Sequence, residues 1–423
     1  MELKGKKLLI LGAYSTEIEV INEAKKLGVY TIATDNHTDR ALSPAKAVAD
    51  EACDISWSDY DALEKFCREN NVDGCISGFS EIRIKILSEF CRRMGFHDYT
   101  DGADLDTITN KEKFRDACIK CGVPVPDEYE PDDDPPHYPV IVKPVDNAGC
   151  RGISLCHNKE EVLAAYEAAR KSSYCGQAII EEYVEGDEPQ YEPAFFYTIH
   201  NGTVTLDSSL DRVMKNMGDG IIKQAVANVY PSKYLDTYIE KQDRQIKALL
   251  SSLGMKNGIV FLQGKMKNGE FLPVDIGFRL EGSLSFHYSD YINSVNPMQM
   301  MIRYALTGTM GDDEFIDKTS EPHFDKTGVT VVLLVTKGKI AHISGLEEIE
   351  KEKCVIHITR KLKVGDECRL LADFSQVLSR IYLCSDDRQE LIRTIDKIYD
   401  TVKVLDENGN NMLIGRYDAD ELK

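Results

Sequence analysis

The 423-residue sequence predicts a protein of mixed α/β and α+β class in three parts. These are a doubly wound parallel sheet, a central α+β region and a small β-rich C-terminal region. Three observations predict them. Strand and helix patterns alternate over the first hundred residues, a turn-rich acidic stretch (PDDDPPHYP) follows at 131–139, and the last hundred residues are mostly strand-like. At roughly 150 residues per domain, the length fits two or three domains.

The N-terminal part is expected to be a β-α-β-α-β-α series. Apolar strand patterns lie at 6–14, 29–35 and 72–78, and amphipathic helix patterns at 17–28, 60–70 and 81–95. Strands that alternate with helices form a parallel sheet. A dinucleotide fold is an alternative, because the second strand ends in Asp35, but residues 11–15 lack the G-x-G-x-x-G spacing and disfavour nicotinamide binding.

The central and final parts mix both kinds of element. A helix is expected at 110–121, two strands joined by a small-residue loop at 140–156, a helix at 159–172 and a strand at 178–186. Residues 192–310 are predicted to form strands and two helices. The final part opens with two strands around the Lys337-Gly338 turn and contains one helix near 388–401.

Composition and charge exclude several function classes. The chain has 51 basic and 71 acidic residues, a formal net charge of −20, whereas a nucleic-acid-binding surface is basic. The apolar start at 8–13 is too short for a signal-peptide core, and no run reaches the roughly 20 apolar residues of a membrane helix. We therefore expect a cytoplasmic protein without nucleic-acid or membrane partners, whose 12 cysteines are reduced thiols.

Two segments carry residue types suited to a nucleotide. Lys143 ends an apolar strand just before the loop 146–152, where glycine backbone N–H groups and a cation can hold phosphates. Residues 181–184 end another strand, whose backbone can meet an adenine edge, and the carboxylates of 186–188 can accept ribose hydroxyls. Taken singly, each segment is more often an ordinary hairpin or a solvated loop.

A third segment, 259–282, is a predicted β-hairpin around an Asn-Gly turn. If its loop has three residues, Gln263 lies opposite Asp275, and alternation brings Gly277 and Arg279 to the same face. Oxygen ligands for Mg²⁺ and a guanidinium for phosphate would then converge. A two-residue loop would instead put Gln263 and Asp275 on opposite faces. A plain hairpin with an exposed Asp and Arg is the alternative.

In their order and spacing, these segments resemble the ATP-grasp superfamily. The resemblance covers nearly the whole chain: the α/β start, NKEKF at 110–114, GVPVP at 122–126, VIVKPVDNAGCRG at 140–152, EEYVEGDE at 181–188, VDIGFR at 274–279 and the C-terminal region. It implies an N-terminal α/β domain at 1–110, an ATP-grasp domain at 111–310 with a mobile lid at about 138–190, and a β-rich domain at 320–423.

The resemblance also implies a role for each matching residue. Nucleotide binding is implied for the phosphate-side residues Lys111, Lys143, Gly149, Arg151 and Gly152, the adenine segment Glu181, Glu182, Tyr183 and Val184, and the ribose partner Glu188. Gln263 and Asp275 match metal ligands, and Gly277 falls at a third ligand position. Arg279 matches the arginine that stabilises the acyl phosphate and the tetrahedral intermediate.

The implied activity is that of a carboxylate–amine ligase, similar to phosphoribosylamine–glycine ligase, amino-acid ligases and halves of the carbamoyl-phosphate synthase large subunit. ATP and Mg²⁺ (or Mn²⁺) would activate a small carboxylate as an acyl phosphate, which an amine captures with release of ADP and phosphate. The resemblance also allows a homodimer, since homodimers are common among similar proteins.

The departures from the family pattern lie at the metal. Gln, Asp and Gly at 263, 275 and 277 leave one carboxylate where two are usual, and hard cations prefer charged oxygens. The alternative function is therefore an ATP-binding protein with a degenerate metal site and little or no ligase activity. Substrate-side candidates are Glu81, Arg83, Arg212 and Glu281, whereas His287 is expected to be a packed or exposed histidine rather than a base.

Overall fold

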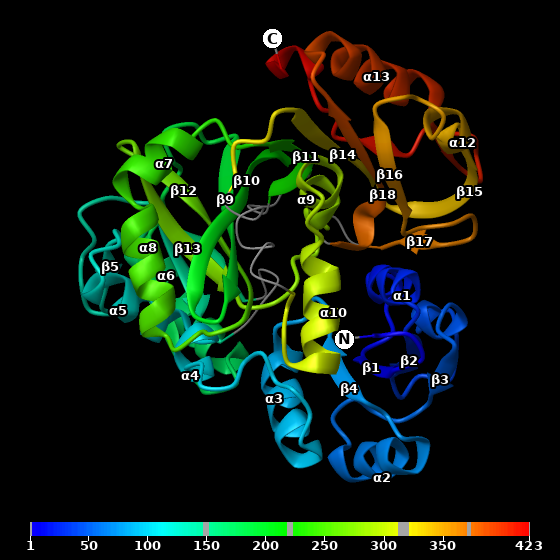
Figure 1. Ribbon diagram of the computed structural model, residues 1–423. Helices are drawn as coiled ribbons and strands as arrows, with labels where there is room; N and C mark the ends of the chain where they lie inside the picture. Colours follow the sequence, from blue (N-terminus) through cyan, green and yellow to red (C-terminus); the bar gives the residue numbers. More distant parts are fainter. Residues whose placement is uncertain (1, 147–151, 218–222, 312–320, 370–373, 423) are drawn as a thin grey trace.

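The structure is a computed structural model that describes residues 2–146, 152–217, 223–311, 321–369 and 374–422 (Figure 1). Its N-terminal part is a four-stranded parallel sheet in the order β3-β2-β1-β4, as the alternating pattern predicts. The elements are β1 (Lys7–Leu11), α1 (Glu17–Lys26), β2 (Tyr30–Thr34), η1 (Pro44–Ala47), β3 (Glu51–Cys53), α2 (Tyr60–Asn70), β4 (Gly74–Ser77) and α3 (Ile82–Met94). The short strand β3 was not predicted.

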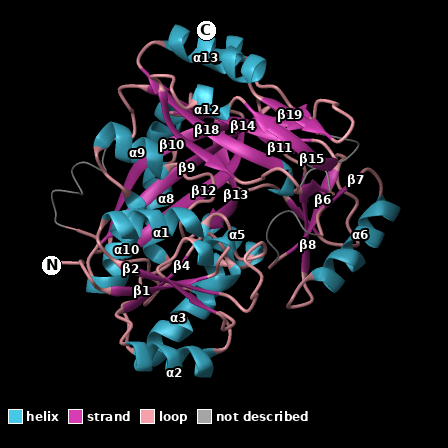
Figure 2. Ribbon diagram, turned by 90° about the vertical axis from the view of Figure 1, so that its right-hand side faces the viewer, coloured by secondary structure: helices cyan, strands magenta, loops and turns pink. Residues whose placement is uncertain are grey.

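A second, smaller sheet has its own core. After α4 (Leu105–Ile108) and α5 (Lys111–Lys120), the strands run in the order β5-β8-β6-β7, with α6 (Lys159–Ser172) packed on them. Their bounds are β5 (Glu128–Tyr129), β6 (Val140–Pro144), β7 (Ser154–Cys156) and β8 (Ala178–Glu182). In Figure 2 this unit lies to one side of the remaining layers. Val142, Val162 and Ile180 are buried within it.

The largest sheet has nine strands and is antiparallel. Its order is β13-β12-β9-β10-β11-β14-β18-β16, with β20 paired to β14. The bounds are β9 (Tyr191–His200), β10 (Thr203–Asn216), β11 (Lys223–Tyr230), β12 (Gly258–Lys267), β13 (Glu270–Gly277), β14 (Thr327–Val335), β16 (Val355–Arg360), β18 (Val377–Ser385) and β20 (Leu413–Ile414). Because β11 pairs with β14, one sheet runs across the predicted boundary at 310–320. The domain limits stay a prediction.

The two strands around the Lys337-Gly338 turn do not pair with each other. β14 belongs to the large sheet, whereas β15 (Gly338–Ser344) pairs with β17 (Glu367–Cys368) and β19 (Lys403–Asp406). β14 pairs with β11 on one side and with β18 on the other, so it leaves no free edge for β15. It is also buried along almost its whole length. The helix predicted near 388–401 is present as α13 (Arg388–Thr401). The remaining short helices are α12 (Leu346–Ile349), η2 (Phe374–Gln376) and η3 (Ala419–Leu422).

The central region holds four described helices rather than the two expected. They are α7 (Leu235–Lys241), α8 (Asp243–Ser252), α9 (Phe286–Asn293) and α10 (Pro297–Thr307). α10 begins with a capping Asn296 and ends at Gly308 in the left-handed conformation. It lies between the central and N-terminal parts (Figure 1), where Asn296 Nδ2 donates to Glu23 Oε2 of α1 at 2.9 Å.

Most described cysteines are buried, and the eleven of them form no disulfide with one another. Cys175 is exposed and Cys121 half-buried. Among the described residues, no helix combines the length and the apolar character needed to cross a bilayer.

Candidate active site

A pocket lies where α5, β6, β8 and β13 meet. It is lined by Glu81, Ile108, Thr109, Lys111, Phe114, Arg115, Cys118, Val125, Pro126, Lys143, Glu181, Pro273, Val274, Asp275 and Ile276. Five of the residues singled out in the sequence, from five separate segments, therefore line one pocket: Glu81, Lys111, Lys143, Glu181 and Asp275. Apolar walls with a few charged groups are typical of small-molecule sites.

Lys143 and Glu181 form a buried ion pair at this pocket. β6 and β8 are antiparallel neighbours, and the Lys143 ammonium contacts the Glu181 carboxylate. Their side chains are only 7% and 6% exposed. A charge buried in an apolar strand is tolerated when an opposite charge and hydrogen bonds compensate it. An anionic ligand that reaches Lys143 therefore competes with Glu181 for the ammonium.

Lys111 is the first residue of α5. The Asn110 side chain accepts a hydrogen bond from Lys113 N at 3.0 Å, and Lys111 N donates to Val145 O at 2.8 Å, which ties the helix start to the end of β6. The unsatisfied N–H groups of a helix N-terminus add partial positive charge there. Lys111, Lys143 and the start of α5 thus supply positive charge to the pocket, part of which Glu181 balances.

Arg115 also lines the pocket and was missed in the sequence. It lies one turn after Lys111 on α5, and its guanidinium pairs with Glu128 at 3.1 Å and donates to Pro126 O at 3.2 Å. The i, i+4 spacing from Lys111 is the signal that could have found it, because residues four apart share a helix face.

Two further carboxylates, those of Glu81 and Asp275, line the same pocket. Burial, and then the negative charge of Asp275, raise the pKa of Glu81 to about 7, although Arg279 and Lys111 oppose this rise. A carboxyl group that is both desolvated and close to another carboxylate holds its proton at higher pH. Perturbed acids of this kind are enriched at functional sites.

Arg279 follows β13 and lies close enough to Glu81 for its positive charge to lower the pKa of that carboxyl group. The guanidinium lies over the Phe261 ring, 4.9 Å from its centroid, and Nη1 donates to Leu280 O at 3.1 Å. Its Nε is buried without a hydrogen-bond partner among the described residues. A buried donor without an acceptor is costly, which makes this group suited to an anionic ligand.

Gln263 lies opposite Asp275, as the favoured register predicts, but the reason given for it was wrong. The loop has two residues, since Lys267 pairs with Glu270. A β-bulge between Gln263 and Gly264 adds one residue on β13 and restores the pairing. Gly264 permits this close approach, because a Cβ there would lie 2.1 Å from Leu272 O.

An ion-pair network continues from Gln263 along the same sheet. Arg212 Nη1 approaches Gln263 Oε1 at 3.5 Å and Glu192 Oε2 at 3.2 Å, and Lys265 Nζ contacts Glu192 Oε1 at 2.9 Å. Burial alone would raise the pKa of Glu192, but Arg212 and Lys265 lower it below its ordinary value. Arg212 therefore lies beside a predicted metal ligand, as part of a charge-balanced cluster.

Other predicted residues lie outside the pocket lining. Glu188 accepts hydrogen bonds from Lys233 at 2.6 Å and Tyr234 at 2.7 Å, which lower its pKa despite partial burial. Glu182 pairs with Lys267 at 2.6 Å, and Glu281 accepts from Ser283 N at 2.8 Å. Tyr183 and Val184 follow β8 but do not line the pocket.

Arg83 is neither an exposed helix residue nor part of the pocket lining. It is buried at the carboxyl end of the parallel sheet, where Nη1 pairs with Glu17 Oε1 at 2.8 Å and contacts Leu11 O. Gly149 and Arg151 lie outside the described residues, and Gly152 has a positive φ of 78°.

Comparison with known proteins decides the family of the central region. Residues 136–286 match the family model of the ATP-grasp domain. The chain contains an ATP-grasp domain. Residues 140–152, 181–188 and 274–279, which carried the resemblance in the sequence, all fall within this match.

The chain is similar to proteins of several activities. A formate-dependent phosphoribosylglycinamide formyltransferase of Prochlorococcus marinus is 29% identical over 43% of this chain and 48% of its own length, so the match spans about half of that relative. The L-amino acid ligase structure from Bacillus licheniformis superposes with a TM-score of 0.76 at 17% identity, covering 96% of this chain and 100% of the other.

A second similar structure contains a nucleotide. The biotin carboxylase domain of Hydrogenobacter thermophilus 2-oxoglutarate carboxylase, in complex with MgADP and bicarbonate, has a TM-score of 0.75 at 16% identity. It covers 94% of this chain and 90% of the other. At these identities the likeness establishes a shared fold, within which the three named activities differ.

Proposed function

We propose that the protein is an ATP-dependent carboxylate–amine ligase that acts through an acyl phosphate and releases ADP and phosphate. The observation that carries the proposal is that Lys111 and Lys143 line one pocket together with Asp275 and Glu81. Cations for phosphates and carboxylates for a divalent cation are the two requirements of a Mg²⁺–nucleotide site. The similarity to the L-amino acid ligase structure adds support.

The described residues fit this ligand by their chemistry. Lys111 and Lys143 would bind the nucleotide phosphates, Glu182–Val184 the adenine and Glu188 the ribose. Asp275 and Gln263 offer oxygen ligands, and Glu81 would supply a second carboxylate in place of the one that this chain lacks at position 263. A bound Mg²⁺ neutralises phosphate charge during phosphoryl transfer.

The chain's own groups account for the remaining steps. The Arg279 guanidinium, whose Nε lacks a partner among the described residues, would stabilise the developing negative charge of the tetrahedral intermediate. Glu81 must lose its proton before it can ligate a cation, so its raised pKa makes metal binding weaker below pH 7. The small-molecule substrates would be a carboxylate and an amine.

A second candidate function is ATP binding without turnover. One observation favours it: the Gln263 amide oxygen faces Arg212 at 3.5 Å, which competes with a metal for that oxygen. Metal dependence separates the two functions, because a ligase needs Mg²⁺ or Mn²⁺ for turnover and a binding protein does not.

The test is ADP and phosphate release with Mg²⁺ across pooled carboxylates and amines. We expect release that requires one member of each pool, and loss of at least ~100-fold in Asp275→Asn, since a carboxylate ligand is removed. The matched control is Asp236→Asn, an aspartate that is 90% exposed on α7. Tight ATP binding without release in any pool would favour the second function.

A further inference from the structure

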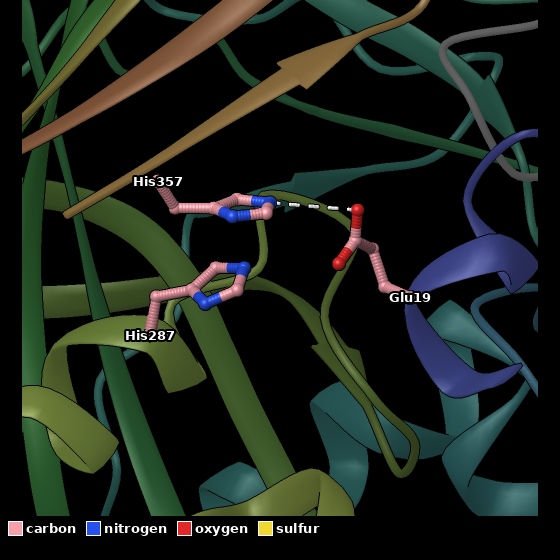
Figure 3. A group of neighbouring side chains, drawn as sticks. All are labelled: Glu19, His287 and His357. Carbon is pink, nitrogen blue, oxygen red and sulfur yellow. Dashed lines mark ion pairs between the residues drawn. The ribbon is translucent and has the colours of Figure 1, made fainter. Parts of the chain in front are cut away.

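Three side chains from distant parts of the chain meet at the junction of the N-terminal and C-terminal regions (Figure 3). Glu19 comes from α1, His287 from α9 and His357 from β16. One potential ligand atom of each lies within 4.8 Å of those of the other two. His357 Nε2 lies 3.5 Å from Glu19 Oε1, and the two imidazole rings stack with centroids 4.1 Å apart.

Both imidazoles have a ring nitrogen without a hydrogen-bond partner among the described residues. His287 Nε2 and His357 Nε2 are buried and accept or donate no hydrogen bond among the described residues. A buried polar atom left in this state costs free energy, so two adjacent ones need an explanation. Two further rings next to His287 are those of Phe286 at 4.0 Å and Tyr382 at 5.0 Å.

The burial of the cluster also suits a ligand. Burial, followed by the neighbouring His357 and Lys26, lowers the pKa of His287 well below its ordinary value, and neutral imidazole is the form that binds metals. Glu19, with a side chain only 12% exposed, offers the carboxylate.

We propose that Glu19, His287 and His357 bind one divalent transition-metal ion of the Zn²⁺ type. Two imidazole nitrogens and one carboxylate oxygen form a common zinc donor set, with bonds of about 2.0–2.2 Å and a fourth position open to water. The ligand atoms, now within 4.8 Å of one another, would have to move closer together by rotation of their side chains. Oxygen-preferring Mg²⁺ is disfavoured at two imidazoles.

The metal would join three segments that are far apart in sequence. It would link α1 of the N-terminal region to α9 and to β16 of the large sheet. Tyr382, whose ring contacts both imidazoles, donates its hydroxyl to Ser283 O at 2.7 Å. Ser283 lies between Arg279 and α9, so the metal would stabilise the segment next to the candidate active site. The inference does not depend on the proposed ligase function.

The test uses the full-length protein, stripped of metal by a chelator and held in millimolar Mg²⁺ to occupy oxygen-only sites. Zn²⁺ is titrated against a competing chelating dye. We expect one equivalent to bind, with affinity lowered at least ~10-fold in His287→Ala, His357→Ala and Glu19→Gln. His342→Ala is the matched control, because His342 is exposed on β15 and bonds only to Ser344 among the described residues.

X-ray absorption at the zinc edge gives a second readout that needs no variant. Nitrogen and oxygen neighbours at about 2.0 Å with imidazole scattering support the site, whereas sulfur at about 2.3 Å would assign the ion to cysteines and overturn it. Failure of the wild-type protein to bind Zn²⁺, or undiminished binding in the His287→Ala/His357→Ala double variant, would also overturn it. Zn²⁺ should raise the Tm of the wild type but not of the double variant.

Discussion

Replacement of Glu81 by glutamine tests the electrostatics of the pocket directly. In the folded protein, burial and Asp275 raise the pKa of Glu81 from 4.5 to about 7. In the unfolded chain the same carboxyl group titrates near its ordinary value. Between these two pH values the unfolded state has lost the proton and the folded state has kept it, so stability falls as pH rises. The stabilising contribution of protonated Glu81 to the free energy of unfolding is complete below about pH 4.5 and is lost above about pH 7.

The magnitude follows from the size of the shift. At 1.36 kcal/mol for each pKa unit, Glu81 costs the wild type up to about 3 kcal/mol of unfolding free energy between pH 4.5 and pH 8. Glu81→Gln removes this titration. Relative to the wild type, the variant should therefore gain up to about 3 kcal/mol over that pH range.

The assay is urea denaturation of both proteins at pH 4.5, 6 and 8, without nucleotide and with a chelator present. Glu69→Gln is the matched control, because its side chain is 62% exposed and it lies on the surface of α2. That control should follow the wild type at every pH. If the free energy of unfolding changed with pH in the same way in Glu81→Gln and in the wild type, the placement of Glu81 beside Asp275 would be refuted.

Two further predictions concern the walls of the pocket. Lys143→Ala leaves Glu181 buried without its partner and should cost about 3–5 kcal/mol in urea denaturation, most of which Glu181→Gln restores in the double variant. The control Lys339→Ala breaks an ion pair with Glu407 whose side chains are 55% and 64% exposed, and it should lower the free energy of unfolding by under about 1 kcal/mol. Equal losses of unfolding free energy in Lys143→Ala and Lys339→Ala would contradict a buried pair at Lys143. Gly264→Ala pushes a Cβ to 2.1 Å from Leu272 O and should cost more than about 2 kcal/mol, whereas Gly282→Ala, with nothing within 4 Å, should leave the Tm nearly unchanged. Equal melting temperatures for these two variants would show that the bulge does not constrain position 264.

Local signals explain why several helices were predicted with their bounds. α2, α6 and α13 begin after Asp59, Asn158 and Asp387, and each of these side chains accepts a hydrogen bond from the first turn. Such caps are encoded by residues next to the helix itself. The parallel N-terminal sheet was predictable for a similar reason, since its β-α alternation is visible along the chain.

Long-range pairings could not be predicted in the same way. The pairing of β11 with β14 joins residues about a hundred positions apart, and nothing local distinguishes it from the expected β14–β15 hairpin. The bulge beside Gly264 reversed the consequence of a two-residue loop. From the sequence we expected only one carboxylate at the predicted metal site. Glu81 is far from Asp275 in sequence, and only the tertiary fold brings the two into one pocket.

The most direct test of the ligase account is the fate of oxygen from the carboxylate substrate. Once a carboxylate and an amine that release ADP are known, the carboxylate is labelled with ¹⁸O and the phosphate product is analysed by mass spectrometry. An acyl phosphate passes one carboxylate oxygen to phosphate, so we expect one ¹⁸O in each phosphate released during amide formation. Unlabelled phosphate released together with the amide product would contradict the acyl-phosphate mechanism.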